Sequence, residues 1–288
     1  MLIGQRLAAL RRALPGARKG DVQAVHQTRV ATRRLREALP VVARGGTARK
    51  LRRVARRLTR TLGPVRELDV ALLTLEELAT GGDVPRRAIT WLRRSVTDER
   101  RRLHAELVRR IDRCDVDKLQ RKALATARDK HSPRPTVRDK RRVAAARARA
   151  ARRAERLRGS IENAAGMYLP DRLHEVRIAV KKLRYAMEVT RELSGSRATA
   201  RIDTLKRMQD LLGRMHDFEV LIARTRAIQG SPGAPDLRVS GGLDTLVRRL
   251  ETECRQLHGQ YIATRQPILV ICDHVIAADS RGSRADAA

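Results

Sequence analysis

HQTRVATRRLR, from His26 to Arg36, and HEVRIAVKKLR, from His174 to Arg184, are two copies of one pattern. Each copy opens with a histidine, carries an arginine three residues later and closes on a run of basic residues. Recurrence of such a segment at one fixed spacing is typical of a duplicated structural unit. The fold is therefore expected to contain the same unit twice.

A second repeated segment follows each copy and extends the duplication. LTRTLGPVRELDVALL occupies 58–73, and MQDLLGRMHDFEVLIA occupies 208–223. The first pair of segments is separated by 148 residues and the second by 150, so the spacing is nearly constant. Two bundles related by a pseudo-twofold axis are the arrangement that this duplication predicts.

The spacing of charged and apolar residues within these segments predicts helices with one basic face and one apolar face. On a helix that turns by about 100° per residue, His26, Arg29, Arg33 and Arg36 fall within about 80° of one another. Leu35 and its apolar neighbours lie on the opposite side, where they would face a core. The same spacing recurs at His174, Arg177, Lys181 and Arg184, and a further basic ridge is formed by Arg49, Arg53, Arg56 and Arg60.

Helical periodicity continues along the whole chain, and runs of β-branched or aromatic residues typical of strands are missing. An all-α fold is therefore predicted. Helix breaks are expected at glycine and proline pairs, among them 15–16, 45–46, 63–64, 81–82, 230–235 and 241–242. We expect the first bundle to occupy 1–132, the second 133–280, and a disordered tail 281–288.

The charge of the chain indicates an anionic partner. Lys and Arg total 64 against 32 Asp and Glu, for a net charge of +32 and a pI near 11.6. Arginine predominates over lysine, and its planar guanidinium binds phosphate oxygens in pairs. A solvated helix face usually mixes both signs, but Glu37 is the one acid between Arg29 and Lys50. Such dense like charge is expected to be neutralised by a polyanion.

Cysteine usage and hydropathy exclude several protein classes. The three cysteines are far apart and form neither a disulfide framework nor a metal-binding pair of CxxC type. The N-terminal residues are not expected to act as a signal peptide, because Arg6, Arg11 and Arg12 interrupt their apolar residues, and no apolar run approaches the length of a membrane span. We expect a cytoplasmic protein that does not contact a membrane.

The two histidine–arginine segments, with LGPVRELDV and MQDLLGRMHD following them, resemble the CHAD family, the conserved histidine α-helical domain. The resemblance covers nearly the whole chain in the family's order. It implies a pair of four-helix bundles around a basic central groove or pore that binds inorganic polyphosphate. It also implies an association with polyphosphate granules.

The resemblance implies a set of phosphate-contacting residues in each half. In the first half these are His26, Arg29, Arg33, Arg34, Arg36, Arg53, Arg56 and Arg66. In the second half they are His174, Arg177, Lys181, Lys182, Arg184, Lys206 and His216. The second half has no full counterpart of the ridge formed by Arg49, Arg53, Arg56 and Arg60, because Asp210 stands where the first half has Arg60. The contribution of this part of the second half to binding is therefore in doubt.

Sequence-independent nucleic-acid binding is the main alternative, because charge alone does not separate a phosphodiester from a phosphoanhydride chain. Aromatic residues make up 2% of the chain, which leaves little platform for stacking bases, so such binding is expected to be weak. A second alternative is metal-dependent hydrolysis of phosphate esters, because His216-Asp217 resembles the metal-binding pair of HD phosphohydrolases. That chemistry needs further ligands that the sequence does not supply, so we expect neither catalysis nor a cofactor.

The two repeated histidines have two interpretations. A histidine beside an apolar face is commonly a buried hydrogen-bonding residue. The position of His26 and His174 on the basic faces favours phosphate contact instead, through one N–H donor if neutral or through charge if protonated. The sequence leaves both roles open.

Overall fold

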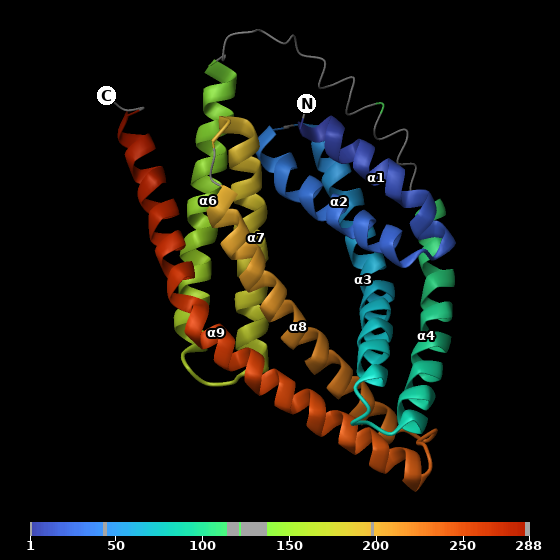
Figure 1. Cartoon of the computed structure of the whole chain (residues 1–288). Coiled ribbons are helices and arrows are strands. Elements are labelled where there is room, and N and C mark those ends of the chain that lie inside the picture. Colours follow the sequence, from blue (N-terminus) through green and yellow to red (C-terminus); the bar gives the residue numbers. More distant parts are fainter. Residues whose placement is uncertain (1, 43–44, 114–120, 122–136, 197–198, 286–288) are drawn as a thin grey trace.

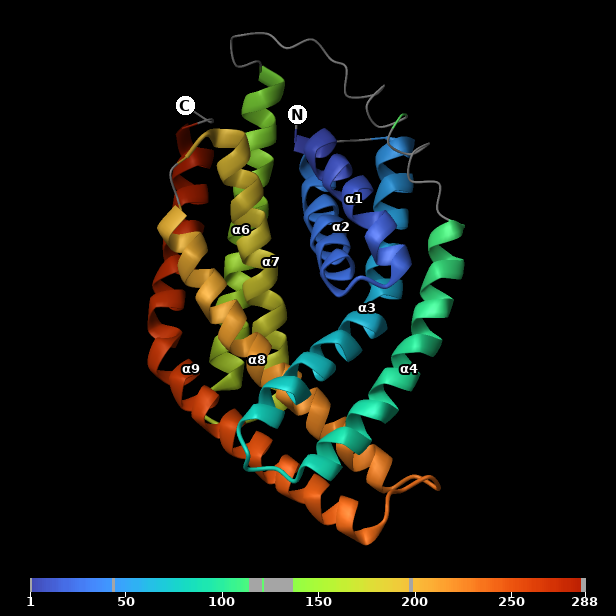
Figure 2. The same ribbon diagram turned by 45° about the vertical axis from the view of Figure 1, so that its right-hand side comes forward.

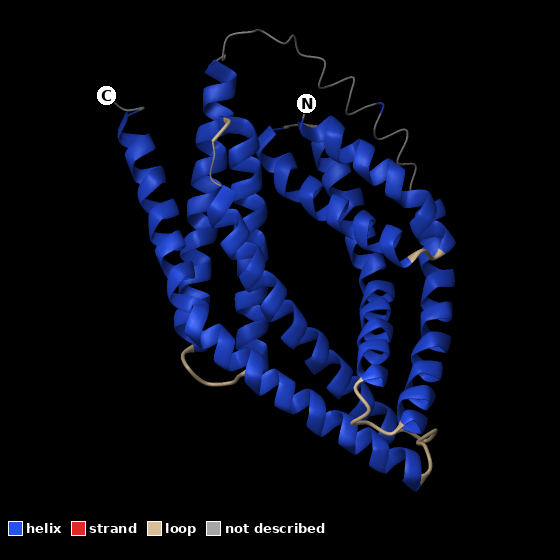
Figure 3. Cartoon of the chain, viewed as in Figure 1, coloured by secondary structure: helices blue, strands red, loops and turns tan. Residues whose placement is uncertain are grey.

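The computed structural model describes residues 2–42, 45–113, 121, 137–196 and 199–285. Within these ranges the regular structure is helical throughout, as Figure 3 shows, and the predicted all-α class is confirmed. The helices are α1 (Leu2–Lys19), α2 (Val22–Val42), α3 (Gly46–Thr80), α4 (Arg86–Asp112), α6 (Val137–Ala164), α7 (Pro170–Ser194), α8 (Thr199–Gln229) and α9 (Leu237–Ala285).

The helices form two bundles in chain order, α1–α4 and α6–α9, and the bundles meet through equivalent members of the repeat. α2 contacts α7, α3 contacts α8, and α4 contacts α9. In Figure 1 and Figure 2 the lower ends of α3 and α4 rest against the far end of α8 and the beginning of α9. Contacts between like helices are what a pseudo-twofold axis requires, so the predicted pairing of bundles is present.

The apolar core runs from one bundle into the other at this lower end. Leu68 of α3 and Leu92 of α4 belong to the same buried cluster as Val176 of α7 and Leu205 of α8. The upper part of the first bundle has its own cluster, which includes Leu7, Leu35 and Leu58. The two halves are therefore not independently buried units, because part of the first bundle is covered by the second.

Two boundaries were predicted from the sequence, one between the bundles and one before the C-terminal tail. The boundary between 132 and 133 lies outside the described residues. α9 continues through the predicted boundary at 281 and ends at Ala285.

Three of the expected helix breaks are wrong, because the glycines concerned lie inside helices. A Cβ on Gly16 would lie 2.6 Å from the Cβ of Ala24, and one on Gly242 would lie 2.7 Å from the Cβ of Ala88. These glycines allow α1 to approach α2 and α9 to approach α4. The third, Gly63, lies within α3 beside Pro64, between the buried residues Leu62 and Val65.

Candidate functional site

The basic faces of α2 and α7 meet where the two bundles touch. Arg29 and Arg33 come from α2, and Arg177 and Lys181 come from the equivalent turns of α7. These groups lie close enough across the α2–α7 contact for each to disfavour the charge on others. We call the joined set the cationic seam: His26, Arg29, Arg33 and Arg66 from the first bundle, and His174, Arg177, Lys181 and His216 from the second.

Lys181 lies at the most positive point of the seam. Burial, followed by repulsion from Arg33, Arg177 and Arg29, lowers its pKa from 10.5 to about 6. After burial, the groups that act most strongly on Lys181 are all basic. The site therefore holds a concentration of basic groups, which Asp217 beside Arg177 and Arg66 offsets only in part.

The repeated Leu-Gly motif makes room for two seam arginines. A Cβ on Gly63 would lie 3.2 Å from Nη1 of Arg29, and one on Gly213 would lie 3.9 Å from Nε of Arg177. Arg29 then donates from Nη1 to the backbone oxygen of Thr59 at 3.2 Å. The repeated glycines thus let each arginine side chain lie across the neighbouring helix.

Arg177 has donor capacity that the protein does not use. Its Nε is buried and has no hydrogen-bond partner among the described residues. Burial lowers the pKa of its guanidinium, and nearby Asp217 acts in the opposite direction. A buried N–H without a partner is costly, so this atom favours an anionic acceptor supplied from outside.

The histidines occupy equivalent places in the two halves but differ in their partners. His174 and His216 place their Nδ1 atoms 3.2 Å apart, a contact in which one ring donates and the other accepts. Burial and the charge of Arg177 lower the pKa of His216 to about 4. In the first half His26 lies near Arg66 in place of a second histidine, and burial again lowers its pKa.

Two predicted residues at the end of the basic segments are held by a buried acid. Arg184 is buried, donates to Glu188 and to Gln209, the latter at 3.0 Å, and lies over the Tyr185 ring at 4.4 Å. Arg34 reaches the same carboxylate from α2 at 3.3 Å. Arg34 therefore joins the two bundles, Arg184 joins α7 to α8 within the second bundle, and the charge of both is partly neutralised.

The other predicted residues lie around the seam. Lys182 is exposed, and its pKa is lowered by burial and by Arg153 and Arg156 of α6. Arg36 is half-buried close to Arg56, which is exposed. Arg53 and Lys206 are also exposed, and within the described residues nothing brings either into the seam.

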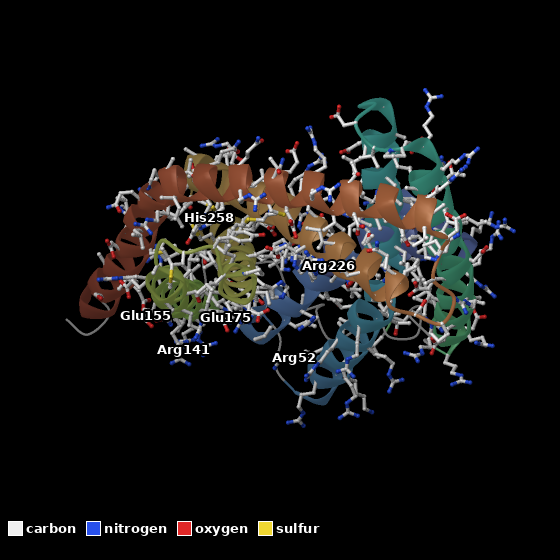
Figure 4. The ribbon with its side chains drawn as sticks, turned by 90° about the horizontal axis from the view of Figure 1, so that it is seen from below. Arg52, Arg141, Glu155, Glu175, Arg226 and His258 are labelled. Atoms are coloured by element: carbon white, nitrogen blue, oxygen red, sulfur yellow. The ribbon has the colours of Figure 1, made fainter. Side chains whose placement is uncertain are left out.

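Three arginines of α6 that were not predicted from the sequence also lie beside the basic residues of α2 and α7. Arg149 and Arg153 reach the carboxylate of Glu37 on α2, at 3.0 and 3.5 Å. Arg156 follows on the same side and lies near Lys182. Their spacing of four and three residues matches that of Arg29, Arg33 and Arg36 on α2, and this match could have identified them from the sequence. In Figure 4, Arg52 of α3 and Arg141 of α6 lie along the same edge of the molecule.

A cavity of about 660 Å³ adjoins the first-bundle end of the seam. His26 and Arg34 of α2 line it together with Arg6 of α1. Glu192 of α7 faces it as well and pairs with Arg6 at 3.0 Å. His26 is therefore shared between the cavity and the seam.

Two further findings bear on alternative kinds of site. Over the part of the chain that the structure describes, no three His, Cys, Asp or Glu side chains are grouped so as to hold a metal ion. None of the described helices combines the length and the apolar character needed to cross a membrane.

The chain was compared with known protein families, sequences and structures. The family model of the CHAD domain matches residues 2–226. The fold is similar to the crystal structure of the CHAD domain from the plant Ricinus communis, with a TM-score of 0.64 and 20% identity over 93% of this chain and 89% of that one. It is equally similar to PptA from Streptomyces chartreusis, with a TM-score of 0.64 and 19% identity over 92% of this chain and 96% of that one. No curated protein sequence matches the chain.

Proposed function

The chain belongs to the CHAD family, and from this premise we propose that it binds inorganic polyphosphate along the cationic seam without catalysing a reaction on it. The observation that carries the proposal is the meeting of Arg29 and Arg33 with Arg177 and Lys181 across two bundles. Repulsion among these groups disfavours the free state. A polyanion removes this repulsion, so binding is favoured by groups that are already in place.

The shape of the seam favours a linear ligand over a compact one. His26 to Arg36 extends for about 15 Å along α2, and His174 to Arg184 extends as far along α7. A single phosphate group meets few of these side chains at once. A chain of linked phosphates meets successive cations from both helices, so affinity should grow with chain length.

Polyphosphate is preferred over nucleic acid because the aromatic side chains are occupied elsewhere. Phe218 and Tyr261 are fully buried in the core, and Tyr185 is buried beneath Arg184. Trp91 of α4 packs against the core. Base stacking adds roughly 1–3 kcal/mol per base where a platform exists, and these rings offer none at the seam.

This function assigns the protein to the cytoplasm, at granules where polyphosphate accumulates. A seam that holds successive phosphates with fixed cations suits retention of the chain. Microscopy of the tagged full-length protein in cells with and without polyphosphate tests this placement. A diffuse signal in both backgrounds would remove the granule from the proposal.

The direct test is a competition experiment at fixed ionic strength. A labelled polyanion bound to the protein is displaced by long-chain polyphosphate, tripolyphosphate or duplex DNA. Long polyphosphate is expected to displace the label at the lowest concentration of phosphate units. Equal potency of tripolyphosphate would contradict an extended seam, and stronger displacement by DNA would favour a nucleic-acid ligand.

Paired variants then locate the binding surface. Arg29→Ala/Arg33→Ala should flatten the slope of log affinity against log salt by about one to two units, because each lost phosphate contact removes about 0.7–0.9. The control pair Arg248→Ala/Arg255→Ala removes the same charge from exposed positions on α9, which packs against α4, α6 and α8. Equal flattening by the control would show that overall charge, rather than the seam, is responsible.

A further inference from the structure

The amino group of Lys181 stands apart from the other cations of the seam in its chemistry. Arginine keeps its proton, but lysine loses it readily when buried among like charges and then becomes a nucleophile. Arg29 and Arg33 face Lys181 from α2, and Arg177 and Lys182 flank it on α7. His174 and His216 also lie near it.

The same neighbours form a receptor for a small phosphate-bearing reagent. Arg177 offers a buried Nε that has no hydrogen-bond partner among the described residues. Arg29 is held in place by the Thr59 carbonyl oxygen at 3.2 Å and by the space that Gly63 leaves. A phosphate group that binds these arginines is brought beside Lys181, which is half-buried.

We propose that Lys181 is a modification site at which small acyl phosphates, captured through their phosphate by the surrounding arginines, acylate the amino group. The Nζ lone pair attacks the carbonyl carbon, and the bond from that carbon to the phosphate oxygen breaks. An amide forms, and inorganic phosphate leaves with the proton that the amine releases. The reaction needs no other reactant, and it removes the capacity of Lys181 to carry charge.

The site shares its residues with the proposed polyphosphate seam, but its reactivity does not depend on the identity of the long ligand. If polyphosphate occupies the seam, it excludes the acyl phosphate. Acylation in turn prevents Lys181 from taking up a proton when a polyanion binds, so the two events are expected to oppose each other. A supply of acyl phosphate would then weaken retention of a polyanion.

The test treats the full-length protein with acetyl phosphate at pH 7 and follows acetylation of each lysine by mass spectrometry. Lys19 and Lys140 are exposed on α1 and α6 and serve as internal references. With a pKa of about 6, about nine-tenths of Lys181 is neutral at pH 7, against fewer than about one in a thousand for an ordinary lysine. Weaker nucleophilicity at low pKa offsets part of this advantage, as it does for thiolates, so Lys181 should react at least about tenfold faster than the references.

Three outcomes bear on the proposal. Acetylation of Lys181 no faster than that of Lys19 and Lys140 would overturn it. Acetic anhydride lacks a phosphate, and an equal preference for Lys181 with both reagents would overturn capture by the arginines. A larger preference with acetyl phosphate supports it, and Lys181→Arg verifies the assignment of the signal.

Long-chain polyphosphate separates this inference from the proposed function. Protection of Lys181 by the polymer is expected if both hold. Rapid acetylation that the polymer leaves undiminished would count against polyphosphate in the seam, while the reactive lysine would stand.

Discussion

Binding of a polyanion to the seam should take up a proton, and Lys181 should be its main acceptor above pH 7. In the free protein its pKa is about 6, so about 9% of it is protonated at pH 7. A bound phosphate chain cancels the surrounding positive charge and allows the pKa to return towards its ordinary 10.5. Complete return gives an uptake of about 0.9 proton at pH 7 and a fall in affinity of about ninefold from pH 7 to pH 8.

Other groups near Lys181 do not produce this dependence in the same range. Arg29 stays mostly protonated there, because its pKa, lowered first by burial and then by Arg33 and Arg177, is still about 9. The pKa of His216 is about 4, and those of His26 and His174 lie below 6.5, each lowered first by burial. Even a complete return to 6.5 adds no more than about a quarter of a proton per histidine at pH 7 and about 0.03 at pH 8. The window from pH 7 to 8 therefore reports mainly on Lys181.

Calorimetry in two buffers of different ionisation enthalpy measures the proton uptake directly. A long polyphosphate is the suitable ligand, because just its two ends titrate near neutral pH. Lys181→Arg keeps a permanent charge and should remove most of the uptake at pH 7, whereas the control Lys140→Arg, at an exposed position on α6, should preserve it. The reasoning is refuted if the wild-type protein takes up no proton or if Lys181→Arg leaves the uptake unchanged.

Three more predictions concern stability and catalysis. The pKa of Lys181 is lower in the folded protein than its ordinary value, so the unfolded chain binds more protons between about pH 6 and 10.5. The stability of the wild-type protein therefore rises with pH over this range. Lys181→Met removes this effect and should raise Tm more at pH 6 than at pH 9. Gly242→Ala should destabilise the fold by about 1–3 kcal/mol in denaturant unfolding, because its Cβ would lie 2.7 Å from that of Ala88. Gly259→Ala, where a Cβ would meet nothing within 4 Å, should stabilise by up to about 1 kcal/mol, and equal effects would contradict the packing account. Phosphate release from tripolyphosphate with Mg²⁺ or Mn²⁺ should stay at background, and sustained release lost in His216→Ala would contradict the binding role.

The duplication was readable from the sequence because two helix faces recur with their spacing intact. Arg29 and Arg177 hold equivalent positions on α2 and α7, and the apolar faces behind them recur as well. What the spacing alone does not state is that α2 lies against α7. That contact depends on the shared lower core, where Leu68 and Val176 belong to one cluster although they come from different halves.

Glycine and proline pairs gave wrong predictions of helix ends where the glycine allows two helices to pack closely and the chain does not turn. Gly45 and Gly82 adopt positive φ angles of 94° and 75° near helix ends, as expected of helix breaks. Gly242 instead lies within α9, where a helix of another bundle approaches too closely for any larger residue. The two uses look alike in the sequence, because the distinction lies in what the glycine contacts.

Arg36 and Arg184 are equivalent in the repeat but play different roles, and the sequence contains the reason. The repeat treats the two as equivalent, but the residue four positions later is Pro40 in the first half and Glu188 in the second. Residues four apart are neighbours on a helix, so an arginine pairs with the glutamate and not with the proline. Arg184 is accordingly buried against Glu188, while Arg36 stays among arginines of α3.

The distribution of acids around the seam explains how a repulsive site can persist in a folded protein. Glu188 on α7 holds Arg34 of α2, Glu37 on α2 holds Arg149 of α6, and Glu192 on α7 holds Arg6 of α1. Each of these pairs joins the two bundles beside the seam rather than within it. Because the helices are fixed by these contacts and by the shared core, Arg29, Arg33 and Arg177 cannot separate to relieve their repulsion, and Lys181 relieves its own share by losing its proton. The strain is therefore retained until an anion enters, and its release adds to the free energy of binding instead of to the stability of the free protein.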